Sequence, residues 1–144
     1  MAQKKVGRGR AVGIGGVFLR AKEPKKLAAW YKAHLGLPVS DGLVIFEWQT
    51  PGRPRRGQTV WSVVDDASSG WGRNRRPAMV NYRVDDLERL LTKLRRSGQA
   101  VDPRVEMGEY GKFGWVTDPA GNRIELWEPP RRRPGPAAPL VPME

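Results

Sequence analysis

Glu125 is the residue of this sequence whose position most clearly suggests chemistry. It lies in residues 118–127, where Asp-Pro-Ala-Gly-Asn is followed by Arg-Ile-Glu-Leu-Trp. Proline ends a strand and a Gly-Asn pair is typical of a two-residue hairpin turn, so a second strand is predicted directly after it. Strand alternation places the two aliphatic residues on one face and Arg123, Glu125 and Trp127 on the other. Because a buried carboxylate is costly, we expect that face to be wet or functional.

Composition limits the other groups that could take part in such chemistry. The 144 residues fit one domain and include no cysteine, which excludes disulfides and thiolate metal sites and fits a cytoplasmic protein. The only histidine, His34, falls near the end of a predicted helix, where a surface or capping role is expected. No apolar run approaches the roughly 20 residues that span a bilayer, so no membrane association is expected. Residues 1–10 are basic but lead into no apolar segment typical of a signal peptide.

The net charge of +11 lies mainly on the two ends of the chain and on two arginine-rich loops. The body between them is close to neutral, so we expect the charged side chains of the ends and loops to be exposed to solvent, and we expect no nucleic-acid partner. Non-specific binding of polyanions through the ends and loops is the alternative, and it would depend strongly on salt. Residues 1–11 are predicted to be a flexible basic N-terminus, and the Pro/Arg-rich residues 130–144 to be an extended tail.

The elements that must position Glu125 occur twice. Each copy has a strand, a helix that ends at glycine, and three further strands, and residues 65–77 join copy 12–64 to copy 78–129. The helix faces carry Leu27, Ala28, Tyr31 and Leu35 in the first copy, and Leu87, Leu90, Leu91 and Leu94 in the second. The strands that follow are predicted at 37–41, 43–49 and 58–64, and at 100–107, 112–118 and 122–128. The fold class is α+β, with two tandem βαβββ modules whose sheets form an open cup.

This pattern resembles the vicinal oxygen chelate superfamily, which includes glyoxalase I, extradiol dioxygenases and bleomycin-resistance proteins. The resemblance covers about residues 12–129 and rests on the paired units and above all on the Asp-Pro-Ala-Gly-Asn-Arg-Ile-Glu-Leu motif. Residues 110–115 and 125–129 look like a bacterial branch of that superfamily. Open sheet edges in such proteins are usually covered by a partner, so a homodimer is expected.

The resemblance implies metal ligands on the first and last strands of each unit. Those positions fall on Gly16, Met79, Glu125 and either Ser62 or Trp61, so one carboxylate is left. A thioether does not suit the hard divalent metals of this superfamily. We therefore predict a degenerate metal site, no metal and no cofactor, which argues against glyoxalase and dioxygenase activity.

If Gly16 and Met79 point into the cup, as the resemblance implies, alternation names the remaining lining residues. They are Phe18, Arg20, Trp48, Trp61, Asn81, Arg83, Arg123 and Trp127, around Glu125. Such aromatics and arginines suit a flat ligand that carries an oxyanion. The alternative is structural: Glu125 pairs with arginines, and the aromatics belong to an ordinary core or a dimer interface. Trp71 in the joining segment is either a lid or a surface residue.

Three functions remain open. The first is metal-independent binding of a small neutral or anionic aromatic molecule in the cup, because arginines should repel a cationic drug. The second is a lyase or isomerase with Glu125 as general base and Arg83 or Arg20 holding an oxyanion, with or without a divalent metal. The third is the polyanion binding described above.

Overall fold

The computed structural model describes residues 7–49, 56–66 and 69–130; the predicted tail apart from Pro130, and residues 1–6 of the basic N-terminus, lie outside these ranges. The strands are β1 (Ala11–Ala21), β2 (Leu43–Gln49), β3 (Arg56–Asp65), β4 (Ala78–Val84), β5 (Ala100–Val101), β6 (Glu106–Gly108), β7 (Gly111–Thr117) and β8 (Arg123–Glu128). The helices are α1 (Pro24–Leu35) and α2 (Leu87–Arg96), and a 3-10 turn covers Ser69–Trp71. Among the described residues, neither helix is long and apolar enough to cross a membrane.

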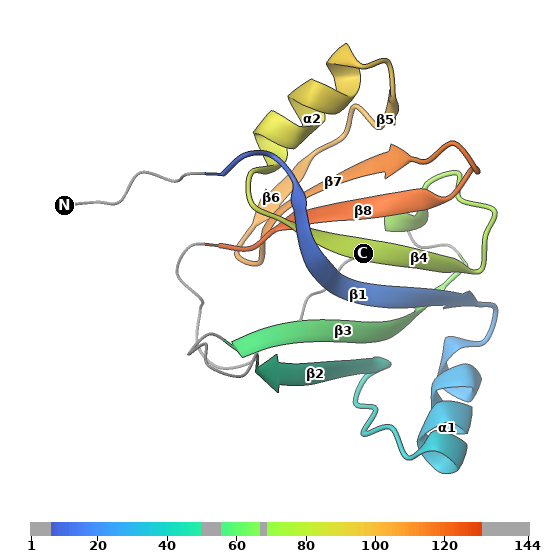
Figure 1. Ribbon diagram of the computed structural model, residues 1–144. Coiled ribbons are helices and arrows are strands. Elements are labelled where there is room, and N and C mark those ends of the chain that lie inside the picture. Colours follow the sequence, from blue (N-terminus) through green and yellow to red (C-terminus); the bar gives the residue numbers. More distant parts are fainter. Residues whose placement is uncertain (1–6, 50–55, 67–68, 131–144) are drawn as a thin grey trace.

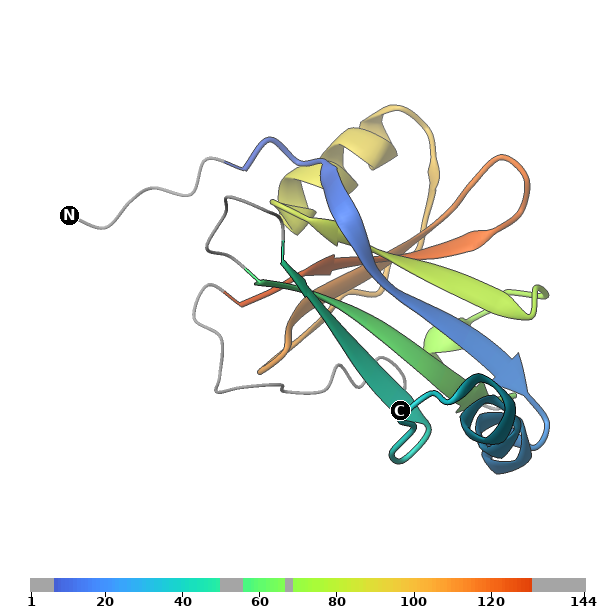
Figure 2. The same ribbon diagram turned by 60° about the horizontal axis from the view of Figure 1, so that its bottom comes forward.

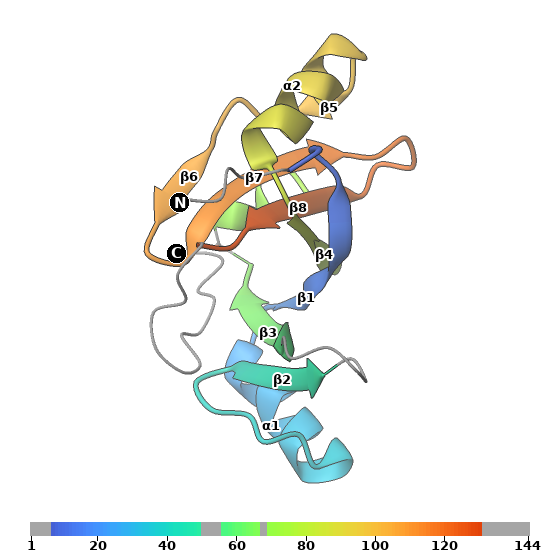
Figure 3. The ribbon, with the colours of Figure 1, turned by 60° about the vertical axis from the view of Figure 1, so that its left-hand side comes forward.

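The described strands form one open sheet in the order β2-β3-β1-β4-β8-β7-β5, with β6 also paired to β7. Within each half the first and last strands pair in parallel, β1 with β3 and β4 with β8. The two halves meet where β1 and β4 pair antiparallel at the centre of the sheet (Figures 1 and 2). Seen from the side, the sheet bends between its halves, and α1 and α2 lie at opposite ends (Figure 3). The predicted α+β fold with an open, curved sheet is therefore confirmed.

The predicted strand at 37–41 is wrong. Only Ser40 makes an isolated bridge, to Leu43, because Asp41 and Gly42 both take positive φ values and turn the chain tightly into β2. Pro38 also lacks the N–H that a strand would donate. In the second half the corresponding stretch, 100–107, forms two short strands, β5 and β6, rather than one. β2 is therefore left at the end of the sheet order.

The two helices differ in how they are fixed. Asp86 caps the N-terminus of α2, because its side chain accepts a hydrogen bond from the Arg89 amide (3.1 Å), and the helix buries Leu87 and Leu91 against the sheet. α1 has no side-chain cap, and Ala28 is its one buried residue. Leu35, predicted to share a helix face with Leu27, Ala28 and Tyr31, is 60% exposed.

The predicted flexible N-terminus does not extend to residues 8–10. The amides of these three residues donate to the Asp85 carboxylate at 2.9–3.0 Å, and the Lys93 ammonium donates to the Arg8 carbonyl. Burial raises the pKa of Asp85, but the three backbone N–H groups outweigh it, and the pKa lies below its ordinary value. The chain is thus bound to α2 before β1 begins.

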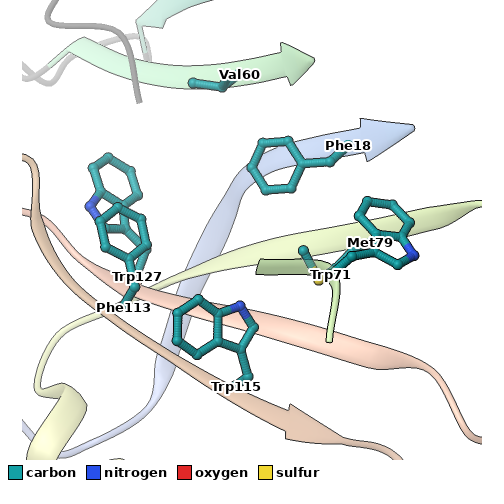
Figure 4. Close-up of a cluster of buried hydrophobic side chains, with 7 residues drawn as sticks. All are labelled: Phe18, Val60, Trp71, Met79, Phe113, Trp115 and Trp127. Carbon is teal, nitrogen blue, oxygen red and sulfur yellow. The ribbon is translucent and has the colours of Figure 1, made fainter. Parts of the chain in front are cut away.

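Apolar side chains cover both faces of the sheet. One cluster lies between α2 and the convex face and consists of Val84, Leu87, Leu91, Val116 and Leu126. The other fills the concave face and consists of Phe18, Val60, Trp71, Met79, Phe113, Trp115 and Trp127 (Figure 4). The predicted cup is therefore occupied by the protein's own aromatic side chains.

Candidate functional site

Glu125 lies in a row of side chains that crosses the centre of the sheet. In β-sheet register, Gly16 of β1 is opposite Asn81 of β4, Asn81 is beside Glu125 of β8, and Glu125 is opposite Trp115 of β7. Paired residues in a sheet project to the same face, so this row lies on the concave side. The predicted alternation of β8 is confirmed, because Leu126 belongs to the convex cluster and Trp127 to the concave one.

The Glu125 carboxyl group is completely buried and held by two neutral donors. Asn81 Nδ2 donates to Oε1 at 2.7 Å, and Trp115 Nε1 donates to Oε2 at 3.0 Å. Burial raises the pKa of Glu125 to about 7, against the lowering effects of these hydrogen bonds and of the Arg123 charge. A carboxyl group with such a pKa can hold or release a proton near neutral pH.

Gly15 makes room for the Asn81 side chain, and Gly16 makes room for the neighbouring Val60 carbonyl group. The register between β1 and β4 shifts between Ile14 and Gly16, which places Gly15 in a bulge. A Cβ atom on Gly15 would lie only 2.2 Å from Asn81 Oδ1, and one on Gly16 would lie 2.6 Å from the Val60 carbonyl oxygen. Within the described part of the chain, Asn81 Oδ1 is the one buried side-chain N or O atom that lacks a hydrogen-bond partner. The amide is therefore positioned by its bond to Glu125 and by close backbone contact.

Most predicted lining residues are brought together on the concave face. Phe18, Met79 and Trp127 are buried in the cluster beside Asn81 and Glu125. The Arg83 guanidinium lies 5.6 Å from the centre of the Trp127 ring, at the end of the cup where Phe113 stacks on the same ring.

Arg20 and Arg123 reach the cup, but they contact the segment that joins the two halves. Arg20 Nη1 donates to the Asn74 carbonyl at 2.9 Å, and Arg20 Nε lies 3.5 Å from the Asp66 carboxylate. Arg123 Nε donates to the Gly70 carbonyl at 3.2 Å, and its Nη2 pairs with Asp102 at 3.0 Å. Both arginines thus act as clamps at the rim of the cup.

The predicted inward orientation of Trp61 and Trp48 is wrong. Trp61 packs against Tyr31 of α1 with ring centres 4.9 Å apart, so it lies on the helix side of the sheet. Trp48 lies on the same side, because its ring covers Gly57 and its Nε1 donates to Thr59 Oγ1 at 3.1 Å. Residues 60–64 contain apolar residues on both faces of β3, so alternation alone does not decide which of them point into the cup. In the structure Ser62, which pairs with Phe18, takes the inward position.

Three residues of the concave cluster, Trp115, Phe113 and Trp71, were missed or undervalued. Trp115 could have been found by counting back along the hairpin from Glu125, because the two residues face each other across it. The turn of this hairpin spans residues 118–122 rather than two residues, with the Asp118 carboxylate accepting the amides of Ala120 and Asn122. Phe113 follows from the same alternation as Trp115, whereas no local pattern predicts that Trp71 is buried.

The donor set around Glu125 does not fit a divalent metal. Both carboxylate oxygens accept hydrogen bonds from neutral donors, Gly16 offers no ligand, and Met79 offers only a thioether. No cluster of three or more His, Asp or Glu side chains suitable for a metal occurs within the described ranges. The His34 ring lies 5.2 Å from the Trp30 ring on α1, tilted by 41°, and His34 is exposed, so it lies outside the cup.

Comparison with known proteins agrees with this architecture. No curated protein matches the chain significantly. Among solved structures, methylmalonyl-CoA epimerase from Mycobacterium tuberculosis is similar, with 21% identity, 90% of this chain and 93% of that chain covered, and a TM-score of 0.51. A variant of the Streptomyces coelicolor methylmalonyl-CoA epimerase in complex with 2-nitronate-propionyl-CoA is 14% identical, with 85% of this chain and 97% of that chain covered, and a TM-score of 0.61. A glyoxalase/bleomycin resistance protein/dioxygenase superfamily member from Vibrio splendidus is 15% identical, with 78% of this chain and 95% of that chain covered, and a TM-score of 0.53.

These structural likenesses concern the fold. The family assignment comes from the sequence, because the glyoxalase-like domain matches residues 16–127, from Gly16 of β1 to Trp127 of β8. The matched range contains all four residues of the row Gly16, Asn81, Glu125 and Trp115. This chain therefore belongs to the family of glyoxalase-like domains.

Proposed function

We propose that this protein binds a small, flat aromatic molecule, neutral or anionic, in the cup of its sheet. The observation that carries the proposal is the buried Glu125 carboxyl group at the centre of an aromatic concave face. An ordinary core gains nothing from a carboxyl group that has to be desolvated, whereas a ligand site uses a few placed polar groups among apolar walls. The methylmalonyl-CoA epimerase complex supports the idea that proteins of this fold hold small molecules.

The charges at the rim favour a neutral or anionic ligand over a cation. Arg20, Arg83 and Arg123 reach the concave side, and all three lie against tryptophan rings of the cluster. Their combined positive charge raises the cost of bringing a cationic molecule into the cup. Sequestration of such a ligand, without chemical change, requires no metal and no further group.

A binding screen with paired variants tests this proposal. The full-length chain is titrated calorimetrically with matched aromatic carboxylates, neutral phenols and aromatic amines of similar size. Binding of the first two classes in preference to the amines is expected, and Glu125→Gln should change the affinity. Glu47→Gln is the matched control, because Glu47 is a strand carboxylate that is exposed on β2. If no compound binds, or if both variants behave alike, the proposal is wrong.

A lyase or isomerase is a second candidate, and the pKa of about 7 at Glu125 favours it. A carboxylate with that pKa can take a proton from an acidic carbon beside a carbonyl group and return it, which is the step of an isomerase. The test is proton exchange: ketones and thioesters are incubated with the protein in D₂O, and deuterium incorporation is followed by NMR. Exchange should disappear in Glu125→Gln and persist in Glu47→Gln. Exchange that survives in Glu125→Gln would exclude Glu125 as the base.

We also propose that the protein is a homodimer that uses its first half. Trp30 and Leu35 on α1 and Phe46 and Trp48 on β2 are all more than two-fifths exposed, and β2 ends the sheet. A second copy that pairs antiparallel with β2 would cover both the strand edge and these side chains. Sedimentation equilibrium should give a dimer that Phe46→Glu converts to a monomer. A monomeric wild-type protein would contradict this.

A further inference from the structure

Trp71 fills the cup without belonging to any strand. It lies in the segment 69–77 that joins the two halves, yet its side chain is only 1% exposed. It packs in the same cluster as Phe18, Met79 and Trp115, and Trp115 is the residue that donates to Glu125 (Figure 4). The indole ring of Trp71 therefore occupies space that the sheet would otherwise offer to another flat ring.

The segment around Trp71 is held at the rim by side chains. Arg123 binds the Gly70 carbonyl, Arg20 binds the Asn74 carbonyl, and Asn74 Nδ2 donates to the Ala78 carbonyl at 3.3 Å. Gly70 and Gly72 flank Trp71, and Gly72 has a φ of +57°, a conformation that glycine adopts readily. Side-chain clamps and flanking glycines can open without breaking strand pairing.

The contacts of the Trp71 ring define what could replace it. Its Nε1–H donates to the Arg76 carbonyl at 3.2 Å, and the Arg20 guanidinium lies 5.4 Å from its ring centre. The position thus offers an acceptor at one edge of the ring and a cation over its face, which suits an electron-rich, planar bicyclic ring with an N–H group.

We infer that Trp71 occupies the position of a ligand ring, and that the cup takes planar, electron-rich bicyclic heteroaromatics with a ring N–H group in exchange for it. This inference rests on the proposed binding function and specifies its ligand class. Because the native indole must leave first, wild-type affinity is reduced by the small fraction of molecules in which Trp71 is out of the cup.

The test uses indole as the probe, with benzothiophene as the control of the same shape but without the N–H group. In full-length Trp71→Ala, indole should raise the melting temperature measured by circular dichroism and should bind at least about tenfold more tightly than to wild type. Benzothiophene should be weaker. Met107→Ala, which shortens a large apolar side chain that is 72% exposed on β6 and lies outside the proposed dimer surface, is the control and should behave like wild type. If Trp71→Ala does not fold, Trp71→Leu serves the same comparison.

Exchange in the wild-type protein is followed by hydrogen–deuterium exchange. Saturating indole should accelerate amide exchange in residues 70–73, because the part of the segment that carries Trp71 loses its contacts, whereas residues 74–76, which include the acceptor carbonyl of Arg76, stay in place. If aromatic ligands bind wild type while this segment stays protected and Trp71→Ala binds no better, the inference is wrong and the proposed binding function stands. If indole stabilises Trp71→Ala but no aromatic compound binds wild type, the cup is a closed core, and both are wrong.

Discussion

Replacement of Glu125 by glutamine should change the pH dependence of stability in a defined direction. The pKa of Glu125 is about 7 in the folded protein and 4.5 ordinarily. Between these values the folded protein keeps a proton that the unfolded chain has released, so stability falls as pH rises from 4.5 to 7 and is constant above 7. One pKa unit corresponds to about 1.4 kcal/mol, so the shift makes the wild-type protein about 3 kcal/mol less stable at pH 8 than at pH 4.5 through this group alone.

Glu125→Gln removes this penalty without leaving the site unpaired. The glutamine oxygen can accept the Trp115 indole N–H as the carboxylate does. Its NH₂ group can donate to Asn81 Oδ1 once the Asn81 amide has turned over, and that oxygen has no partner in the wild-type structure. The variant and the wild type should therefore be of similar stability near pH 4.5. At pH 8 the variant should be more stable by about 3 kcal/mol.

Urea unfolding followed by circular dichroism from pH 4.5 to 8.5 measures this difference. The pKa values of Asp85, Asp102 and Asp118 are lowered, so the stability that these groups provide is lost only at acidic pH, below this window. The exposed Glu47→Gln variant corrects for general charge effects. A difference between Glu125→Gln and wild type that does not grow with pH would refute the assignment of Glu125 as a buried, neutral acid.

Other variants test the packing and the anchoring of the chain. Gly15→Ala places a methyl group against Asn81 and should destabilise the protein by about 1–3 kcal/mol in urea unfolding. Asp85→Ala removes the acceptor for three backbone amides, so residues 8–10 should exchange rapidly with D₂O and stability should fall by about 2 kcal/mol. Leu91→Ala should cost about 2–5 kcal/mol, because Leu91 of α2 is buried against the sheet, whereas Leu35→Ala, made in the monomeric Phe46→Glu variant, should leave the melting temperature almost unchanged because Leu35 is exposed. Equal effects of the two leucine substitutions would contradict the described packing.

The sequence predicted the second half of the fold better than the first. Residues 78–129 have strong local signals. One is a helix with four leucines at helical spacing, and the other is a hairpin in which aliphatic residues alternate with Arg123, Glu125 and Trp127. In the first half, the short stretch before β2 looked like a strand by composition, but a turn at Asp41 and Gly42 decided its conformation. Residues 60–64 are apolar on both faces, so the pattern gave a strand without fixing which face turns inward.

The candidate site was predicted only as far as strand alternation reaches. Asn81, Glu125 and Trp127 share one face because each lies on a strand with a clear period. Arg20 and Arg123 lie at the rim of the cup, but they contact backbone carbonyls of the joining segment and the carboxylates of Asp66 and Asp102, which no local pattern identifies. The burial of Trp71 is likewise set by tertiary packing, because its own neighbours are glycine, serine and arginine.

The antiparallel pairing of β1 with β4 has a consequence for how the protein reaches its native state. β1 lies between β3 and β4, while β2, the next strand in the chain, lies at the edge of the sheet. Asn81 and Glu125 are 44 residues apart and still hydrogen-bonded. Long chain closures must therefore precede completion of the cup, and such non-local topologies fold slowly. The β7–β8 hairpin can form early and would then expose Trp115 and Trp127 to water, so the newly made protein is most prone to self-association before its halves join.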